Sequence, residues 1–213
     1  MSLPVIVIGG GGHAKVLIDA LRAGSIPVLA VTDADPRKIG AELLGIPVAG
    51  SDELVQNHDP KSVRLVNGLG SVRPTDRRRL IYEKFKARGF SFASVIHPSA
   101  IVSREVILGE GVQIMAGAVV QAGSTIGDNS ILNTRTAVDH DCIIGRHVHL
   151  APGVVLSGGV QVDDGAHVGT SASVIEGVRI GNSALVAAGS VVVKDVPPGA
   201  TVSGVPAGRA EKK

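Results

Sequence analysis

The chain is poor in aromatic residues and in cysteine. Of its 213 residues only 2% are aromatic, none is tryptophan, and Cys142 is the single cysteine. So few rings are unusual for a packed α/β core, but they suit a narrow structure filled by aliphatic and small side chains. We interpret Cys142 as a small buried residue rather than a reactive thiol.

An excess of charge and long apolar runs are also lacking. Charged residues make up 19% of the chain and the net charge is +2, so nothing indicates a nucleic-acid partner. A short basic run at residues 77–79 is interpreted as a solvated helix face, with steering of an anionic ligand as the alternative. No apolar run approaches the roughly 20 residues that span a bilayer, and Met-Ser-Leu-Pro does not resemble a signal peptide. We therefore expect a cytoplasmic protein.

A strict six-residue period occupies the second half of the chain. Every sixth residue from Val102 to Val192 is Val, Leu or Ile, over sixteen consecutive positions without an insertion. A fixed short period indicates a solenoid, and a period of six is that of a parallel β-helix. Three hexads would close one triangular coil, so residues 18 apart should stack on one another.

Two further positions of the hexad agree with this geometry. The residue two places before the aliphatic one is small or β-branched, as in Ala118, Ser124 and Cys142. Because alternate residues of a strand share a face, both positions should point inward. Glycine recurs directly after the aliphatic residue, as at Gly127 and Gly145, where we expect a tight corner with φ values that side chains resist.

The first 96 residues lack the hexad and alternate between strand and helix patterns. Apolar runs predict strands at residues 5–8, 28–31, 63–66 and 91–96, and helices at 13–23, 52–57 and from Thr75 to residue 88. This alternation favours a small Rossmann-like parallel sheet. We therefore predict two domains, an α/β domain at residues 1–96 and a β-helix at residues 97–213.

A glycine-rich segment lies where the first strand gives way to the first helix. Residues 9–14 satisfy Gly-x-Gly-x-x-Ala, and an acidic residue follows about twenty positions later. Such glycines let the backbone approach a pyrophosphate at a helix N-terminus. We favour a nucleotide diphosphate carried on a sugar; NAD would need two mononucleotide halves, and a purely structural turn is the third alternative. The candidate substrate-binding residues here are Gly11, Gly12, His13, Asp33, Ala34, Gly70 and Ser71.

Several motifs together resemble one family over almost the whole chain. They are the four glycines before His13, His-Pro-Ser-Ala at residues 97–100, the hexapeptide region, and Ser-Gly-Val-Pro-Ala at residues 203–207. The most specific piece is residues 133–145, which contains Asp-His-Asp and is followed by His149 and Pro152. The combination is similar to the bacterial nucleotide-sugar acetyltransferases of the sialic acid, bacillosamine and perosamine type.

The resemblance implies a left-handed β-helix, a homotrimer, and acetyl-CoA bound in the cleft between adjacent helices. It makes His140 the general base, with an acidic partner that is usually glutamate and here is Asp141, one methylene shorter. It adds Asn133 to the substrate-binding residues and implies no metal. The acetyl-CoA groove would include His149, Thr170 and Ala188.

His140 is a candidate from its own position as well. It lies two residues after Val138, at a coil corner where a side chain projects outward, and the residues one coil away are Ala122 and Gly158. A neutral imidazole with an ordinary pKa of ~6.5 suits proton abstraction at neutral pH, and a carboxylate partner would raise its basicity. An amine could then attack a thioester while His140 takes its proton.

We therefore predict an acetyl-CoA-dependent N-acetyltransferase acting on a nucleotide-linked 4-amino-4,6-dideoxy sugar, either GDP-perosamine or a UDP-linked 4-amino sugar. Sugar O-acetylation on the same fold is the alternative. His149 and His167, 18 residues apart, would stack and suggest a zinc site of the carbonic-anhydrase type, but no third histidine shares their register. A non-catalytic trimeric scaffold would have no use for Asp-His-Asp at a corner.

Overall fold

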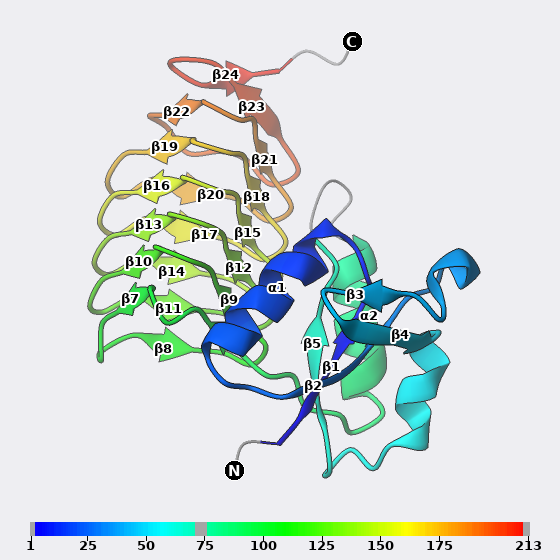
Figure 1. Ribbon diagram of the computed structural model, residues 1–213. Helices are drawn as coiled ribbons and strands as arrows, with labels where there is room; N and C mark the ends of the chain where they lie inside the picture. Colours follow the sequence, from blue (N-terminus) through cyan, green and yellow to red (C-terminus); the bar gives the residue numbers. More distant parts are fainter. Residues whose placement is uncertain (1–2, 71–75, 211–213) are drawn as a thin grey trace. The chain divides into compact units, whose positions relative to one another are not determined.

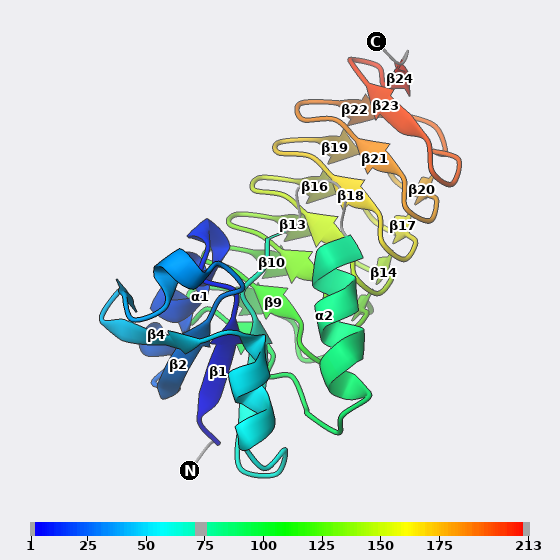
Figure 2. The same cartoon turned by 90° about the vertical axis from the view of Figure 1, so that its right-hand side faces the viewer.

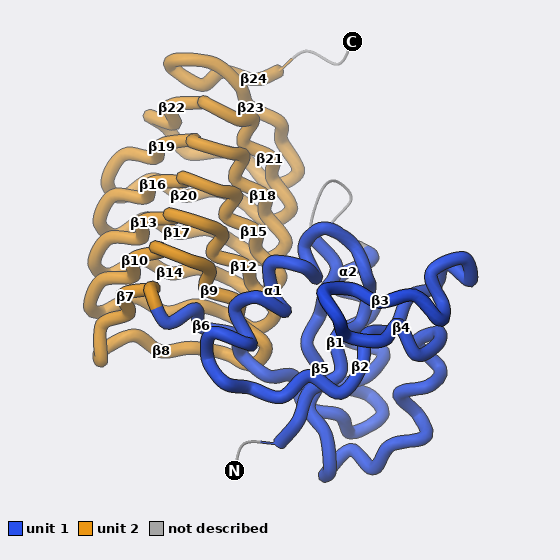
Figure 3. Tube along the Cα trace, in the orientation of Figure 1, with its two compact units in different colours: residues 1–98 blue, residues 99–213 orange. Residues whose placement is uncertain are grey.

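The computed structural model describes residues 3–70 and 76–210. The chain divides into two compact units, residues 1–98 and residues 99–213 (Figure 3). Within the described ranges no helix is long and apolar enough to cross a membrane.

The first unit is built on a five-stranded sheet of order β3-β4-β2-β1-β5. All neighbours are parallel except β3, which pairs antiparallel with β4. Helices α1 and α2 lie on opposite faces of this sheet (Figures 1 and 2). The elements are β1 (Val5–Ile8), α1 (Gly12–Ala23), β2 (Val28–Thr32), η1 (Pro36–Lys38), β3 (Glu42–Leu43), β4 (Ile46–Gly50), η2 (Asp52–Asn57), β5 (Arg64–Asn67), α2 (Asp76–Lys86) and β6 (Val95–Ile96).

The few aromatic residues of the chain all lie in this unit, within residues 82–92. Tyr82 and Phe92 stack with ring centroids 4.7 Å apart, and Phe85 meets Phe90 edge-on at 5.9 Å. The cluster also contains aliphatic residues of β1 and β5, so it joins α2 to one face of the sheet. The ring-poor composition is thus a property of the second unit.

The structure corrects two expectations for the first unit. The β3–β4 hairpin is absent from the prediction because its turn is Leu44-Gly45, with φ values of 52° and 70°, rather than the usual Asn-Gly or Asp-Gly. The strand predicted at residues 91–96 is wrong over most of its length. Only Val95–Ile96 is a strand, preceded by an isolated bridge at Phe92. Thr75, the expected helix cap, lies outside the described residues.

The second unit is a parallel β-helix whose strands stack in three sheets (Figures 1 and 2). From β7 to β22 the partners are parallel and 18 residues apart, as in Val120↔Val138 and His149↔His167. At the end of the coil β23 pairs with β21 at a spacing of 16 residues, and β24 pairs antiparallel with β23. The β7–β22 sheet runs β22-β19-β16-β13-β10-β7, the β8–β20 sheet runs β20-β17-β14-β11-β8, and the β9–β24 sheet runs β24-β23-β21-β18-β15-β12-β9. The strands are β7 (Ile101–Val102), β8 (Ile107–Leu108), β9 (Gln113–Ile114), β10 (Val119–Val120), β11 (Thr125–Ile126), β12 (Ile131–Leu132), β13 (Ala137–Val138), β14 (Ile143–Ile144), β15 (His149–Leu150), β16 (Val155–Leu156), β17 (Gln161–Val162), β18 (His167–Val168), β19 (Ser173–Val174), β20 (Arg179–Ile180), β21 (Leu185–Val186), β22 (Val191–Val192), β23 (Thr201–Ser203) and β24 (Gly208–Arg209).

Both inward positions of the hexad fill the interior of this coil. The aliphatic positions from Ile114 onward are buried, while Val102 and Leu108 in the first coil are partly buried. The second inward position is buried from Val112 onward, including Cys142 and the polar Ser124, while Ala100 and Val106 are partly buried. The Ser124 hydroxyl donates to the Asp139 carbonyl oxygen at 2.8 Å, which satisfies its buried polar group. The hexad therefore predicts the interior correctly.

The corner glycines have a different cause from the expected one. Gly127 and Gly145, directly after the aliphatic residue, do not have positive φ. A Cβ on Gly127 would instead lie 2.6 Å from the carbonyl carbon of Gly145 one coil on. Positive φ falls two residues later, as at Gly123, Asn129 and Asp141. Glycine after the aliphatic residue thus serves close backbone approach, and the prediction about its φ is wrong.

Candidate functional site

The backbone of the turn after β1 packs against the backbone of the turn after β5 at the carboxyl edge of the sheet. Gly9 has φ 92°, a conformation that favours glycine. A Cβ on Gly68 would lie 2.5 Å from the Gly9 carbonyl oxygen. These two glycines are therefore explained by contacts within the protein.

Gly11 and Gly12 have no such explanation. A Cβ on either residue would meet no atom within 4 Å, and neither has positive φ. Gly11 is the N-cap of α1, no side chain caps this helix, and its first turn carries no acidic residue. Because open N–H groups and the helix dipole favour negative charge, this terminus suits an anion such as a phosphate.

These glycines line a cavity of about 820 Å³ at the carboxyl ends of the strands. In parallel α/β sheets this edge is where ligands bind. Ser71 lies outside the described residues, and Asn133 belongs to the second unit. The other predicted substrate-binding residues all line the cavity: Gly11, Gly12, His13, Asp33, Ala34 and Gly70.

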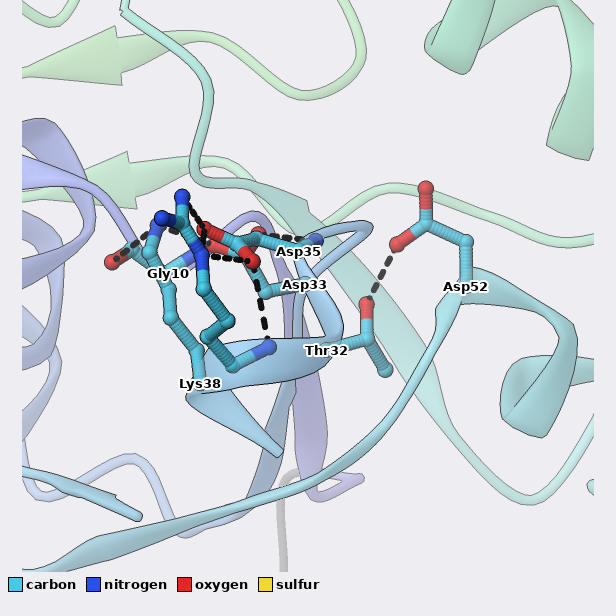
Figure 4. A network of polar contacts seen from close by, with 7 residues as sticks. Gly10, Thr32, Asp33, Asp35, Lys38 and Asp52 are labelled. Carbon is cyan, nitrogen blue, oxygen red and sulfur yellow. Dashed lines mark hydrogen bonds and ion pairs between the residues drawn. The ribbon is translucent and has the colours of Figure 1, made fainter. Parts of the chain in front are cut away.

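Asp33, at the end of β2, is held from several sides (Figure 4). Its Oδ2 accepts from the Gly10 N–H at 2.8 Å and from Lys38 Nζ at 2.7 Å, and its Oδ1 accepts from the Asp35 N–H at 2.9 Å. Burial opposes ionisation, but these hydrogen bonds and the Lys38 charge outweigh it, so the pKa of Asp33 is lowered. Asp33 thus ties the turn after β2 to the glycine loop.

Three further polar residues line the cavity; Lys38 and Asp52 are absent from the sequence prediction, whereas Arg77 belongs to the basic run for which steering of an anionic ligand is the alternative. Lys38 comes from η1, Asp52 begins η2 after β4, and Arg77 lies in α2. The Asp52 Oδ1 accepts a hydrogen bond from the Thr32 hydroxyl at 2.7 Å (Figure 4). Asp52 could have been found only by recognising β4 as a strand next to β2. The sequence does not show this pairing, because the β3–β4 hairpin lacks a usual turn sequence.

The basic run at residues 77–79 is only partly a solvated helix face. Arg77 and Arg79 are exposed, but Arg78 is buried. Its Nη1 donates to the carbonyl oxygens of Asn67 and Leu69, each at 2.8 Å, and burial lowers its pKa to about 9. Arg78 therefore braces the loop after β5 that borders the cavity.

In the second unit, His140 and Asp141 form a pair at a coil corner. The His140 Nδ1 and the Asp141 Oδ2 lie 2.9 Å apart. The neighbouring Asp139 accepts from the backbone N–H of His140 through its Oδ1 at 2.8 Å. Both members of the pair are exposed, with side-chain accessibilities of 57% and 71%. Asp141 can hold the pair because its φ of 58° turns the chain at this position.

The carboxylates around His140 increase its basicity. The hydrogen bond with Asp141 is the main cause that raises the pKa of His140, followed by the charge of Asp139, with Glu176 adding to it. A hydrogen bond at Nδ1 also selects the tautomer whose Nε2 bears the lone pair in the neutral ring. This arrangement is that of a general base oriented by an acid.

Asn133, His149 and His167 form a row along the β9–β24 sheet. The rings of His149 and His167 lie edge-on with centroids 4.9 Å apart, as the 18-residue spacing predicts. The Asn133 Nδ2 lies 3.2 Å from the His149 Nε2. Thr170 and Ala188 follow on later coils, both exposed, with the Thr170 carbonyl accepting from the Gly189 N–H at 2.8 Å.

The candidates in the β-helix occupy two different corners of the coil. Asn133, Thr170 and Ala188 follow strands of the β9–β24 sheet and precede strands of the β7–β22 sheet. His140 lies at the next corner, between the β7–β22 and β8–β20 sheets. The coil therefore brings His140 and Asp141 together but does not bring them to the proposed acetyl-CoA residues.

A metal centre finds no support in the described ranges. No group of three or more His, Cys, Asp or Glu residues there could hold a metal ion. The buried Cys142 has its pKa raised by burial, which disfavours the thiolate.

The two units match two families. Residues 4–85 match the PglD N-terminal domain, and residues 105–134 and 123–158 match the bacterial transferase hexapeptide family (six repeats). The fold and these matches define a hexapeptide-repeat transferase in which a Rossmann-like domain is followed along the chain by a left-handed β-helix, as the sequence predicts.

Solved structures narrow this class. PerB from Caulobacter crescentus, in complex with CoA and GDP-perosamine, is 44% identical over 99% of this chain and 100% of that one, with a TM-score of 0.90. The acetyltransferase domain of PglB from Neisseria gonorrhoeae, in complex with acetyl coenzyme A, is 36% identical over 99% and 100%, with a TM-score of 0.90. The chain belongs to this family of bacterial amino-sugar N-acetyltransferases.

A curated relative supports the same family. UDP-N-acetylbacillosamine N-acetyltransferase of Bacillus subtilis is 40% identical over 115 residues. The match spans about half of each protein, 53% of this chain and 51% of the relative.

Proposed function

We propose that this protein transfers the acetyl group of acetyl-CoA to the amine of a nucleotide-linked 4-amino-4,6-dideoxy sugar. The observation that carries the proposal is the 2.9 Å pair of His140 Nδ1 and Asp141 Oδ2. It orients an exposed imidazole as a general base on a β-helix of the family whose relatives bind CoA and GDP-perosamine. Acetyl-CoA and nucleotide sugars are cytoplasmic metabolites, which supports a cytoplasmic location.

The chemistry requires only a positioned base. The sugar amine attacks the thioester carbonyl, forming a C–N bond, and the Nε2 of His140 accepts the proton that the nitrogen loses. The tetrahedral intermediate then collapses, the C–S bond breaks, and the CoA thiolate leaves, taking up the proton from the imidazolium. No acyl-enzyme forms, which agrees with the burial of Cys142.

The first unit would bind the nucleotide sugar. Its diphosphate would approach Gly11 and Gly12, where the structure leaves room and N–H groups are open. His13, the Asp33-Ala34 turn and Gly70 line the same cavity, and Ser71 follows directly in the chain. We assign the β-helix to acetyl-CoA and catalysis, with Asn133 reaching the substrate.

The acetyl-CoA residues His149, Thr170 and Ala188 would act with His140 of a neighbouring chain. Thr170 and Ala188 lie at the corner after the β9–β24 sheet, and His149 lies in β15 of that sheet, whereas His140 lies at the next corner. One β-helix offers a pantetheine arm a single wall, whereas small ligands are normally buried on most sides. We therefore propose a cyclic homotrimer with three equivalent sites between chains.

The test is acetyl transfer itself. CoA release would be measured with acetyl-CoA and a panel of GDP- and UDP-linked 4-amino sugars. His140→Ala should lower kcat by roughly 10²–10⁴, the usual contribution of a positioned general base, while nucleotide affinity stays unchanged. A loss of less than about threefold would remove His140 from the mechanism.

The chemistry of the product distinguishes sugar O-acetylation from N-acetylation. Hydroxylamine cleaves an acetyl ester but leaves an amide intact. A product that keeps its acetyl group under this treatment supports N-acetylation, and a product that loses it supports the alternative.

A further inference from the structure

Two carboxylates line the described part of the cavity, and they differ in what engages them. Both oxygens of Asp33 accept hydrogen bonds from groups of the protein. Asp52 uses only Oδ1, which accepts from the Thr32 hydroxyl. In the part of the chain that the structure describes, its Oδ2 has no hydrogen bond (Figure 4). Asp52 is therefore the carboxylate that remains able to bind a ligand.

The strand order indicates which part of a nucleotide reaches Asp52. The diphosphate site lies at the start of α1, directly after β1. On one side of β1 the sheet continues with β2 and then β4, and Asp52 follows β4. In related α/β folds the acidic residue after the second strand lies at the ribose. A nucleotide extended in this direction would carry its base one strand further, to Asp52.

We propose that Asp52 reads the base of the donor nucleotide and selects guanine. The inference rests on the proposed function, whose nucleotide it names. A carboxylate has two parallel acceptor oxygens, and guanine offers two parallel donors on one edge, N1–H and the 2-amino group. Such bidentate pairs with a charged partner are short and directional. The hydroxyl of the fully buried Thr32 donates to Oδ1 and so holds the carboxylate in place. Because a carboxylate oxygen has two lone pairs, Oδ1 can accept a second hydrogen bond beside the one to Oδ2.

Uracil matches this arrangement poorly. Its single N3–H lies between two carbonyl oxygens, so one carboxylate oxygen would accept a hydrogen bond while the other faced a carbonyl oxygen. A buried acceptor that meets another acceptor weakens binding. Asp33 does not offer an equivalent alternative, because its oxygens already accept from three groups of the protein.

The test compares the binding of GDP, IDP and UDP to the full-length protein by titration calorimetry. IDP lacks only the 2-amino group of guanine, so it isolates one of the two proposed hydrogen bonds. GDP should bind on the order of tenfold more tightly than IDP, and more tightly than UDP. In Asp52→Asn, one oxygen becomes an amide donor, so the GDP/IDP and GDP/UDP affinity ratios should both fall toward one.

Two further variants keep the result interpretable. Glu53→Gln removes the same charge from the adjacent, exposed residue of η2, which does not line the cavity, and should leave both ratios unchanged. Thr32→Val removes the hydroxyl that orients Asp52 and should reduce the GDP/IDP ratio less than Asp52→Asn does. If Asp52→Asn does not fold, Thr32→Val provides the decisive measurement.

A wild-type protein that binds UDP as tightly as GDP, or an unchanged GDP/IDP ratio in Asp52→Asn, would overturn the inference. Efficient acetyl transfer to UDP-linked sugars with either result would leave the proposed function standing. Conversely, guanine selectivity that depends on Asp52, without acetyl transfer to any amino sugar, would support the base recognition and contradict the proposed function.

Discussion

The imidazole of His140 lies directly over Gly158, one coil further along the β-helix. A Cβ on Gly158 would lie 2.6 Å from Cε1 and 2.7 Å from Nε2 of His140. Gly158 has no positive φ, so the backbone itself does not require glycine here. The small residue provides the space in which the ring lies with Nδ1 toward Asp141.

Gly158→Ala should therefore displace the His140 ring without disrupting the coil. Misplacing a catalytic group by about 1 Å can reduce the rate about 100-fold, so we expect kcat to fall by 10- to 100-fold. Gly208→Ala is the matched control, because its Cβ would meet no atom within 4 Å and its φ is not positive. Equal, small effects of both changes would show that the ring position does not matter.

Asp141→Asn should move the acid limb of the kcat/KM profile to lower pH. The carboxylate raises the pKa of His140, and a base works only when it is deprotonated. Removing the carboxylate lowers this pKa, so the neutral form persists to lower pH. Asp139→Asn, whose charge is a smaller cause, should give a smaller shift in the same direction. An acid limb that stays in place or moves upward would contradict the assignment of Asp141 as the partner.

Gly11→Leu should raise KM for the nucleotide sugar and leave KM for acetyl-CoA nearly unchanged. No protein atom lies within 4 Å of the added Cβ, so the side chain would project into the cavity rather than strain the fold. Steady-state kinetics with each substrate varied in turn would show the difference. Equal increases in both KM values would mean that this loop is not the nucleotide site.

Two substitutions should distinguish a glycine required by close backbone approach, Gly127, from a glycine with positive φ, Gly189. Gly127→Ala forces a contact with the next coil and should lower the free energy of unfolding by about 1–3 kcal/mol. Gly189→Asn should cost less than about 1 kcal/mol, because its φ of 69° suits asparagine and its side of the coil is open. Denaturant unfolding of both variants measures the difference. The reverse order of stabilities would contradict close backbone approach as the reason for glycine after the aliphatic residue.

Mixed oligomers should recover activity from two inactive chains. His140→Ala lacks the base, and Ala188→Trp would block the proposed acetyl-CoA groove at the other corner. In a trimer assembled from both, some interfaces would pair an intact His140 with an intact groove. Verified mixed trimers without activity, or an active monomer by light scattering, would end the shared-site proposal.

Local pattern alone determines the β-helix, because each hexad repeats the same short strand and places its aliphatic residue inward. From Ile114 to Val192 the interior follows directly from the sixfold period, and so does the stacking of His149 on His167. The glycine loop at residues 9–12 can also be predicted from the sequence, since its proposed function depends on backbone access rather than on distant partners. The pairing of His140 with Asp141 is implied by the family resemblance rather than by the hexad, and the two side chains lie 2.9 Å apart.

Only the tertiary structure decides which distant residues share a site and why some glycines are necessary. Asp52 joins the cavity because β4 lies beside β2, and Lys38 binds Asp33 because η1 folds back over the turn. The buried Arg78 and the contact between Gly127 and the next coil depend on elements that meet in space. A sequence pattern records the period and exposure of its own segment, whereas hydrogen bonds and steric limits across elements arise only once the segments pack.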